Sequence, residues 1–465
     1  MTDAISVINP ATEALVKEIS VDNRAVIAQK VEQARQAQPA WSRRSLADRI
    51  EPIAKFRDFL VQDVETLAAI LTTETGKPIA QSKSEILATP QRINFFIENV
   101  ARVMSSQQVH QEPWNALPGT GKLEEIITYE ALGIVANISA WNYPYFVGTN
   151  VFIPALLTGN AVLYKPSEIS TMTGLAIAER LHKAGIPSEI FATVIGTGLA
   201  GAALLEQPID GVFFTGSYET GKKIAIATAP RLIKTQLELG GKDPAYVCND
   251  VDIQTAAASL AEGTFYNNGQ SCCAIERIYV HTNVYNAFLE TFLQIVHQFE
   301  LGDPAQARTY LGPLSRKPQL DVLTQQVADA VSKGAKLRCG GQPVERTGFY
   351  FMPTVLTEVT REMAVMKAET FGPVIGIQEV QGDEEAIALM NDTDYGLTAA
   401  VYSKDRTRAV SILNQVNSGS AYWNCCDRVS PLLPWTGRKH SGIGSTLSEE
   451  GIRTFLRPRG WHLKP

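Results

Sequence analysis

Between residues 161 and 250, the apolar positions alternate between short continuous runs and a helical period. The runs are rich in β-branched and aromatic residues, as is typical of buried strands. They are AVLY at 161–164, FATVI at 191–195, VFF at 212–214, TQLEL at 235–239 and PAYV at 244–247. A helical pattern between the first two runs begins at Ser170 and Thr171 and ends at Gly185. Repeated strand–helix units predict a mostly parallel sheet with helices on both faces.

A second series of the same kind runs from about residue 252 to residue 442. It includes the strand pattern ERIYVHT at 276–282 and an amphipathic helical pattern at 283–299. The first hundred residues have a mainly helical pattern, and LEEIITYEAL at 123–132 has strand character. The predicted fold class is α/β, with two doubly wound domains.

Residues 131–164 carry no charged side chain and no histidine, so their hydropathy matches that of a membrane span. Four asparagines and two prolines lie within this stretch. In lipid the amides would need partners, and the prolines would break a spanning helix. A buried strand, loop, helix and strand is the better interpretation.

Composition and charge narrow the class of protein. The 465 residues are 45% apolar, which suits two or three domains with a large buried interior. The net charge is −6 without a long run of one sign, so no nucleic-acid partner is expected. No secretory signal is visible at the start, and the cysteines have no CxxC spacing, so we expect a cytoplasmic protein with reduced thiols. The six histidines are scattered, and no metal site is expected.

Two glycine turns between strands and helices are candidates for binding phosphate. Gly196, Gly198 and Gly201 form GxGxxG, where small residues let a phosphate approach backbone N–H groups at the start of a helix. A tight packing turn is an equally good interpretation of this motif alone. The turn at 215–217, Thr-Gly-Ser, is the second candidate, and two adjacent units favour a nucleotide.

Two further segments carry candidate polar chemistry. Lys165 and Glu168 follow a strand end, where they could bind ribose hydroxyls or form a solvated turn. The stretch NNGQSCC at 267–273 surrounds two thiols with small and amide residues, and either a nucleophile or a buried structural cysteine fits it. Glu238, after a buried strand, is a candidate general base or a structural acceptor.

Taken together, these motifs resemble the aldehyde dehydrogenase superfamily, of the hydrolytic NAD(P)-dependent type. The resemblance is collinear over nearly the whole chain. The matching motifs are INPAT (8–12), SAWNYP (139–144), PALLTGNAVLYKPSE (154–168), FFTGSYETG (213–221), LELGGKD (237–243), NNGQSCC (267–273), ETFGPV (369–374), NDTDYGL (391–397) and GRKHSGIG (437–444). Several motifs in matching order are far more specific than any one of them.

The resemblance implies a role for individual residues. Cys272 is the nucleophile and Cys273 only its neighbour, Glu238 is the general base, and Asn142 provides the oxyanion-hole amide. The implied cofactor is NAD, with NADP possible. The residues implied to bind it are Trp141, Lys165, Ser167, Glu168, Gly198, Gly216, Ser217, Thr220, Leu239, Glu369 and Phe371.

Two positions depart from the family pattern. Trp435-Thr436-Gly437 replaces the usual aromatic-glycine-glycine, and Ser445-Thr446 replaces Arg-Glu. We expect these changes to affect the substrate tunnel and the packing of the tail while leaving the core chemistry alone.

The resemblance also implies a domain plan and an assembly. Residues 1–112 and 132–238 form the dinucleotide-binding domain, and residues 239–442 form the catalytic domain. Segments 113–131 and 443–465 form a β-flap that joins subunits, so a homodimer or homotetramer is expected.

The expected reaction is oxidation of an aldehyde to a carboxylic acid through a cysteine thioester. Two alternatives stay open: a coenzyme A-acylating enzyme, which Glu238 disfavours, and a catalytically silent protein on the same fold. Tyr143, Val429 and Trp435 are expected to line the substrate pocket and to favour a medium-sized uncharged aldehyde. Arg428 beside them would favour a semialdehyde if it pointed inward, whereas an outward, solvated arginine is the preferred interpretation.

Overall fold

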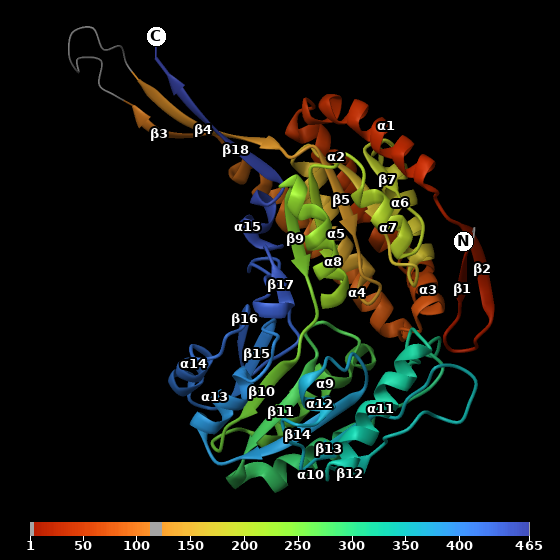
Figure 1. Ribbon diagram of the computed structural model, residues 1–465, viewed down its shortest axis with the longest axis vertical. Helices are drawn as coiled ribbons and strands as arrows, with labels where there is room; N and C mark the ends of the chain where they lie inside the picture. Colours follow the sequence, from red (N-terminus) through yellow and green to blue (C-terminus); the bar gives the residue numbers. More distant parts are fainter. Residues whose placement is uncertain (1–3, 112–122, 465) are drawn as a thin grey trace.

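The computed structural model describes residues 4–111 and 123–464. Two α/β lobes lie one above the other along the long axis, and a thin β arm extends from the upper lobe (Figure 1). The chain crosses from the upper to the lower lobe directly after residue 238, where one sheet ends and the next begins.

The upper lobe contains a six-stranded sheet. Its strands, in spatial order, are β17 (Gly442–Ile443), β9 (Lys234–Glu238), β8 (Gly211–Thr215), β5 (Ile134–Ile138), β6 (Ala161–Lys165) and β7 (Phe191–Thr193). All neighbours are parallel except β17, which runs antiparallel to β9. The strand predictions in this region are confirmed, although β7 is shorter than FATVI.

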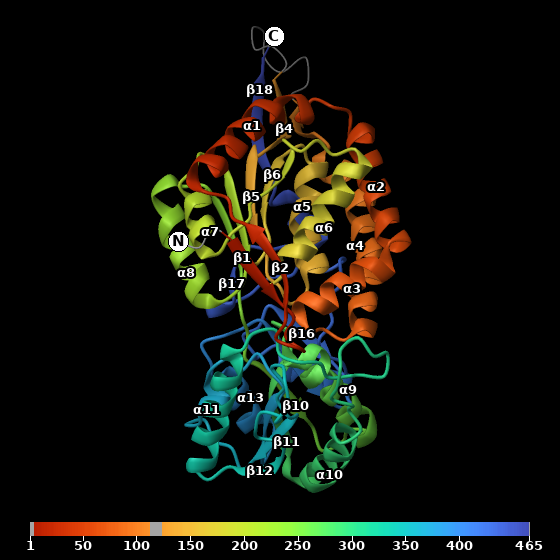
Figure 2. The same ribbon diagram turned by 90° about the vertical axis from the view of Figure 1, so that its right-hand side faces the viewer.

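Helices cover both faces of this sheet (Figure 2). One face carries α2 (Leu46–Gln62), α3 (Val64–Thr75), α4 (Ile79–Met104), α5 (Pro144–Leu157) and α6 (Thr171–Ala184). The other carries α1 (Arg24–Ser42), α7 (Gly198–Leu205) and α8 (Tyr218–Thr228).

The uncharged stretch 131–164 is β5, a loop, α5 and β6, as expected. Its amides are bonded internally; Asn160 donates to the carbonyls of Ala155 and Phe455, for example. Over the described residues, no helix is long and apolar enough to cross a membrane.

The lower lobe contains a seven-stranded sheet. Its strands, in spatial order, are β12 (Lys336–Cys339), β13 (Thr354–Thr357), β14 (Val374–Val380), β11 (Ile275–His281), β10 (Asp243–Val247), β15 (Thr398–Tyr402) and β16 (Ser420–Trp423). Only β12 is antiparallel to its neighbour. Separate apolar clusters fill the two faces. The PAYV run lies here, so this predicted strand belongs to the second sheet.

The helices of the lower lobe are α9 (Ile253–Phe265), α10 (Tyr285–Val296), α11 (Pro318–Ser332), α12 (Ala364–Lys367), α13 (Asp383–Asn391) and α14 (Arg406–Leu413). The helix predicted at 283–299 is α10, which is preceded by a short 3₁₀ turn at Thr282–Val284. Its apolar residues Phe288, Leu289 and Phe292 are buried against the sheet.

The arm is a three-stranded antiparallel sheet in the order β18 (Leu456–Leu463), β4 (Glu124–Ala131) and β3 (Gln107–Gln111). Residues 113–122 of the predicted flap lie outside the described residues. On the C-terminal side, β17 and α15 (Ser448–Arg453) pack on the upper lobe. Of the predicted segment 443–465, the arm therefore contains only the part from Leu456 onward.

An N-terminal hairpin of β1 (Ala4–Ile8) and β2 (Leu15–Ser20) was not expected from the helical pattern of the first hundred residues. The turn between the strands contains INPAT, in which the Asn9 side chain accepts a hydrogen bond from the Ala11 N–H. Ile5, Val7 and Ile19 pack with Ile195 in a small apolar cluster of their own.

Candidate active site

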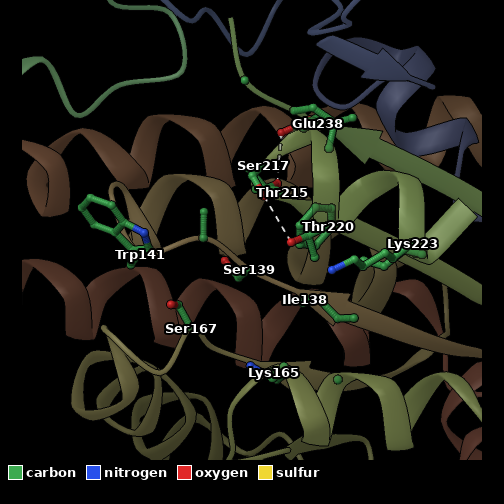
Figure 3. A pocket seen from close by; sticks show the side chains of 18 of the residues that line it. Ile138, Ser139, Trp141, Lys165, Ser167, Thr215, Ser217, Thr220, Lys223 and Glu238 are labelled. Carbon is green, nitrogen blue, oxygen red and sulfur yellow. Dashed lines mark hydrogen bonds between the residues drawn. The ribbon is translucent and has the colours of Figure 1, made fainter. Parts of the chain in front are cut away.

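A cavity of about 900 Å³ lies where the carboxyl ends of β5, β6, β8 and β9 face the lower lobe. All the residues predicted to be catalytic or to bind the cofactor line it. They are Asn142, Glu238, Cys272, Trp141, Lys165, Ser167, Glu168, Gly198, Gly216, Ser217, Thr220, Leu239, Glu369 and Phe371. Open parallel sheets bind ligands at this edge because the strand ends and helix N-termini meet there. Figure 3 shows residues of the upper lobe around this space.

One end of the cavity is built by the turns after β6 and β8. The Lys165 side chain is buried, and burial lowers the pKa of its ammonium group while Glu168 opposes the shift. Its Nζ lies 3.8 Å from a carboxylate oxygen of Glu168. A Cβ at Gly198 would meet no atom within 4 Å, so the space above the start of α7 is open.

The start of α8 faces the same space. Ser217 is the N-cap residue, yet its side chain makes no capping bond and instead donates to Thr220 Oγ1 at 3.1 Å (Figure 3). Among residues 4–111 and 123–464, no side chain accepts from the N–H groups at this end, and such an end favours an anion. Lys223, on the same helix, also lines the cavity, and sequence reasoning missed it. A phosphate-bearing cofactor therefore fits the residues present.

Glu238 ends β9 and is 6% exposed. Its carboxylate accepts hydrogen bonds from Gln236 Nε2 (3.1 Å), Thr215 Oγ1 (3.3 Å) and the Thr446 hydroxyl. Burial raises the pKa of Glu238, and the three donors oppose that shift. A carboxyl with a raised pKa can accept a proton near neutral pH, which a general base requires.

The changes at Ser445-Thr446 were expected to leave the core chemistry alone, yet the Thr446 hydroxyl donates directly to Glu238, the predicted base. Gly442 in β17 pairs with Glu238 in β9, and the chain that follows brings Thr446 over the carboxylate. Because the two residues are 208 positions apart, no local pattern could have revealed the contact.

Asn142 lies in the loop between β5 and α5, and its backbone carbonyl contacts a buried ion pair. Lys77 Nζ donates to the Asn142 carbonyl at 2.6 Å and also pairs with Glu85. The second Glu85 oxygen accepts from the Tyr145 N–H at 2.9 Å. The Asn142 side-chain amide donates to the carbonyl of Gln270 at 3.2 Å, which links this loop to the segment carrying the thiols. Lys77 and Glu85 were not singled out in the sequence.

The thiol segment follows a sharp turn after α9. Asn267 and Asn268 both have left-handed backbone angles, with φ of 54° and 57°. At Gly269 a Cβ would lie 2.4 Å from the Gly372 carbonyl oxygen, so only glycine fits without a shift. The turn places the following residues between the two lobes.

The two neighbouring thiols face different surroundings. Cys272 is half-buried and lines the cavity. Cys273 is buried, and its Sγ donates to Asp427 Oδ1 at 3.0 Å. A hydrogen bond with Cys272, together with burial, holds the pKa of the Cys273 thiol well above its usual range. Burial also raises the pKa of Asp427 to about 6, while its hydrogen bonds from Cys273 and Ser271 oppose the rise. All six cysteines are free.

Glu369 and Phe371 enter the cavity from the lower lobe. The N–H groups of Thr370 and Phe371 donate to Glu276, which pairs with Lys242 at 2.7 Å and so fixes this segment. A Cβ at residue 240 would lie 2.1 Å from Glu369 Oε1, so Gly240 permits the close approach. The Phe371 ring meets Trp141 edge to face, with centroids 5.6 Å apart.

The four predicted substrate residues do not line this cavity. Tyr143 and Val429 are half-buried, and the Tyr143 ring stacks on Phe146 with centroids 5.9 Å apart. Trp435 is buried in the core of the upper lobe, where its backbone pairs with Thr446. Arg428 is exposed.

Comparisons with known proteins agree with this picture. A family model described as Aldehyde dehydrogenase family matches residues 1–460. The succinate-semialdehyde dehydrogenase (NADP+) 1 of Mycobacterium ulcerans is 31% identical over 97% of this chain and 98% of that protein. The lactaldehyde dehydrogenase of Escherichia coli is 32% identical, covering 99% of this chain and 95% of the relative.

Solved structures match equally closely. A crystal structure of lactaldehyde dehydrogenase from Escherichia coli superposes with a TM-score of 0.94 at 31% identity, over 99% of this chain and 96% of the other. An NAD-dependent aldehyde dehydrogenase from Sinorhizobium meliloti gives a TM-score of 0.94 at 31% identity, over 99% and 91% of the two chains.

Proposed function

The chain belongs to the aldehyde dehydrogenase family and is an NAD(P)-dependent oxidoreductase, and on that premise we propose that it oxidises an aldehyde to a carboxylic acid through a thioester on Cys272. One observation carries the proposal. Cys272, Glu238 and Asn142 come from segments far apart in the chain, yet they line one cavity together with the residues proposed to bind the cofactor.

Cys272 is the proposed nucleophile because its thiol opens on the cavity, whereas the Cys273 thiol is buried against Asp427. The Cys272 thiolate adds to the aldehyde carbon, and the carbonyl oxygen becomes an oxyanion. Asn142 has two amide N–H donors; one donates to the Gln270 carbonyl, and the other, which has no acceptor in the described part of the chain, would stabilise that oxyanion.

The bound dinucleotide would supply the acceptor for the hydride that leaves the former aldehyde carbon. Lys165, Ser167 and Glu168 would hold its ribose, and the start of α8 at Gly216 and Ser217 would hold its phosphates. Glu369 and Phe371 would position its reactive ring. These residues fit such a ligand because they line one cavity of about 900 Å³.

Glu238 is the proposed base for the second half of the reaction. It takes a proton from water, the resulting hydroxide adds to the thioester carbon, and the carboxylic acid leaves as Cys272 regains its thiolate. Release of acyl-coenzyme A in place of the acid would overturn this hydrolytic step.

We propose NAD as the preferred cofactor. Glu168 is 45% exposed at the cavity, where its carboxylate would accept from ribose hydroxyls and repel a 2′-phosphate. Lys165 beside it partly offsets that repulsion, so NADP remains a possible second cofactor.

The proposed substrate is a medium-sized aldehyde with an apolar chain, because Tyr143 and Phe146 present an aromatic wall next to Asn142. The expectation of an uncharged aldehyde relied on an outward-pointing Arg428. Arg428 is exposed, so this residue gives no reason to propose a charged substrate.

The domain plan is also kept as a proposal. Residues 1–112 and 132–238 would bind the dinucleotide, and residues 239–442 would carry the nucleophile. Segments 113–131 and 443–465 would join two copies into a dimer or a dimer of dimers, since the arm of β3, β4 and β18 stands away from the lobes (Figure 1).

The reaction is tested with purified protein, NAD and hexanal, by following NADH and the acid product. We expect activity in the wild type and in Cys273→Ala, and none in Cys272→Ala. If Cys273 alone were essential, the assignment of the nucleophile would be wrong.

A further inference from the structure

Arg92 is a buried cation that the proposed function leaves unused. It lies on the buried face of α4 and is 6% exposed. Its hydrogen bonds within the described residues run from Nη1 to Asn150 Oδ1 and from Nη2 to the Val429 carbonyl oxygen, each at 3.2 Å. Neither acceptor carries a charge, although the charges of Glu85 and Glu238 favour the protonated form of Arg92. A buried cation without a direct ion pair is costly, so its presence calls for an explanation.

The Arg92 guanidinium group has more N–H donors than the hydrogen bonds it makes. It carries five N–H groups, and the two bonds to Asn150 and Val429 leave the others without an acceptor in the described part of the chain. Burial lowers the pKa of Arg92 to about 10, so the group is still protonated at neutral pH.

The position of Arg92 relates it to the substrate side of the site. Its Cζ lies 4.0 Å from the centroid of the Phe146 ring, and that ring stacks on Tyr143. Tyr143 directly follows Asn142, the proposed oxyanion donor. Val429, which accepts from the guanidinium through its carbonyl, packs against the same large apolar cluster as Cys272. Arg92 therefore lies at the end of the aromatic wall that is farther from Asn142.

The nearby carboxylates are occupied by other partners. Glu85 binds Lys77 and the Tyr145 N–H. Asp427 accepts from Ser271 and Cys273, and Glu238 accepts from Thr446, Gln236 and Thr215. Lys77 contacts the Tyr143 ring at the near end of the wall, 3.8 Å from its centroid, and is neutralised by Glu85. Of the two cations on this wall, Lys77 has a direct ion pair with Glu85, whereas Arg92 has no direct ion pair within the described residues and only feels the charges of Glu85 and Glu238.

We propose that Arg92 binds a carboxylate at the far end of the substrate, so that among aldehydes with an apolar chain the enzyme prefers those that end in a carboxylate. This inference rests on the proposed function and names its substrate class. The aldehyde carbon would lie at Cys272, the chain along Tyr143 and Phe146, and the carboxylate on the free guanidinium donors, where charge-assisted bonds are strong.

The test compares substrates matched in chain length. Values of kcat and KM are measured for succinic semialdehyde against butanal and for glutaric semialdehyde against pentanal. The proteins are the wild type, Arg92→Met and Arg92→Lys. Arg102→Met is the control, because Arg102 lies on the same helix but is exposed and paired with Glu449.

The wild type should prefer the semialdehyde in at least one pair. Arg92→Met should lower that preference by about tenfold to a hundredfold, mostly through KM, because a charged hydrogen bond is lost. Arg92→Lys should keep part of the preference, and Arg102→Met all of it. The inference is overturned if the wild type prefers the uncharged aldehydes, or if Arg92→Met lowers activity on both members of a pair equally, as a purely structural tie would.

A binding measurement separates this inference from the proposed function. Glutarate should raise the Tm of the wild type and not that of Arg92→Met, whereas butyramide should raise neither. If Arg92→Met does not fold, Arg92→Lys and Arg92→Gln take its place. Equal stabilisation of all variants by glutarate, or none of the wild type, contradicts the role of Arg92. Failure of the wild type to oxidise any of the four aldehydes contradicts the proposed function alone.

Discussion

The two sides of Cys272 are built in different ways. On the cofactor side, most of the predicted lining residues follow the ends of β5, β6, β8 and β9, and they belong to short motifs with their neighbours in the chain. On the substrate side, the polar groups come from single positions on α4 and from the loop around Val429. Sheet topology brings the first set together, whereas the second set depends on packing between distant elements.

This difference predicts where substitutions act. Residues of the motifs should control chemistry and the binding of the cofactor. Isolated residues that contact the motifs from elsewhere should tune protonation and the choice of substrate. Substitutions in the two groups, the motif residues and the isolated residues, test this difference in role.

The largest effect is expected from Glu238→Gln, a change within a motif. Turnover should fall on the order of a thousandfold, because the base that activates water is lost. One equivalent of NADH should still form in the first turnover, since thioester formation does not need this base. Rapid-mixing kinetics at pH 8 measure both; loss of the first NADH as well would show that Glu238 acts before hydrolysis.

The same variant should gain stability at high pH. Burial raises the pKa of Glu238, so the folded protein binds this proton more tightly than the unfolded chain does. The wild type therefore loses stability as the pH rises from the ordinary glutamate range through the raised pKa. Gln cannot ionise, so Glu238→Gln should melt above the wild type at pH 8 but not at pH 5. Equal differences in Tm at both pH values would contradict the burial argument.

A smaller effect is expected from Thr446→Val, which has nearly the same shape but lacks the hydroxyl that donates to Glu238. Without this donor the pKa of Glu238 should rise further, moving the acidic limb of the kcat–pH profile up by about one unit. Activity should recover at high pH, and Thr446→Ser should restore the profile. A loss of kcat that is equal at every pH would indicate a packing defect instead.

The smallest effect is expected from Glu168→Gln on the cofactor side. Removing this half-exposed charge should raise the kcat/KM ratio of NADP over NAD by about threefold to tenfold, because exposed charges are well screened. An unchanged ratio would mean that Glu168 does not face the 2′ position.

The sequence predicted the cofactor side because its residues follow strand ends in recognisable order. It did not predict the contacts of Arg92, Lys77 or Thr446. Arg92 lies in a helical pattern that does not reveal which charged positions are buried. Thr446 reaches Glu238 only because β17 folds back along β9. The N-terminal hairpin was missed for a similar reason, since its few apolar positions complete their cluster with Ile195, which lies far away in the chain.

The central claim is that the acyl group is carried by Cys272. Glu238→Gln, incubated with NAD and hexanal, should accumulate the thioester because hydrolysis is blocked. Digestion at low pH and mass spectrometry would then locate the adduct. The account predicts one hexanoyl group on Cys272 and none on Cys273. A hexanoyl group on Cys273, or an unmodified Cys272 after a full equivalent of NADH has formed, would contradict it.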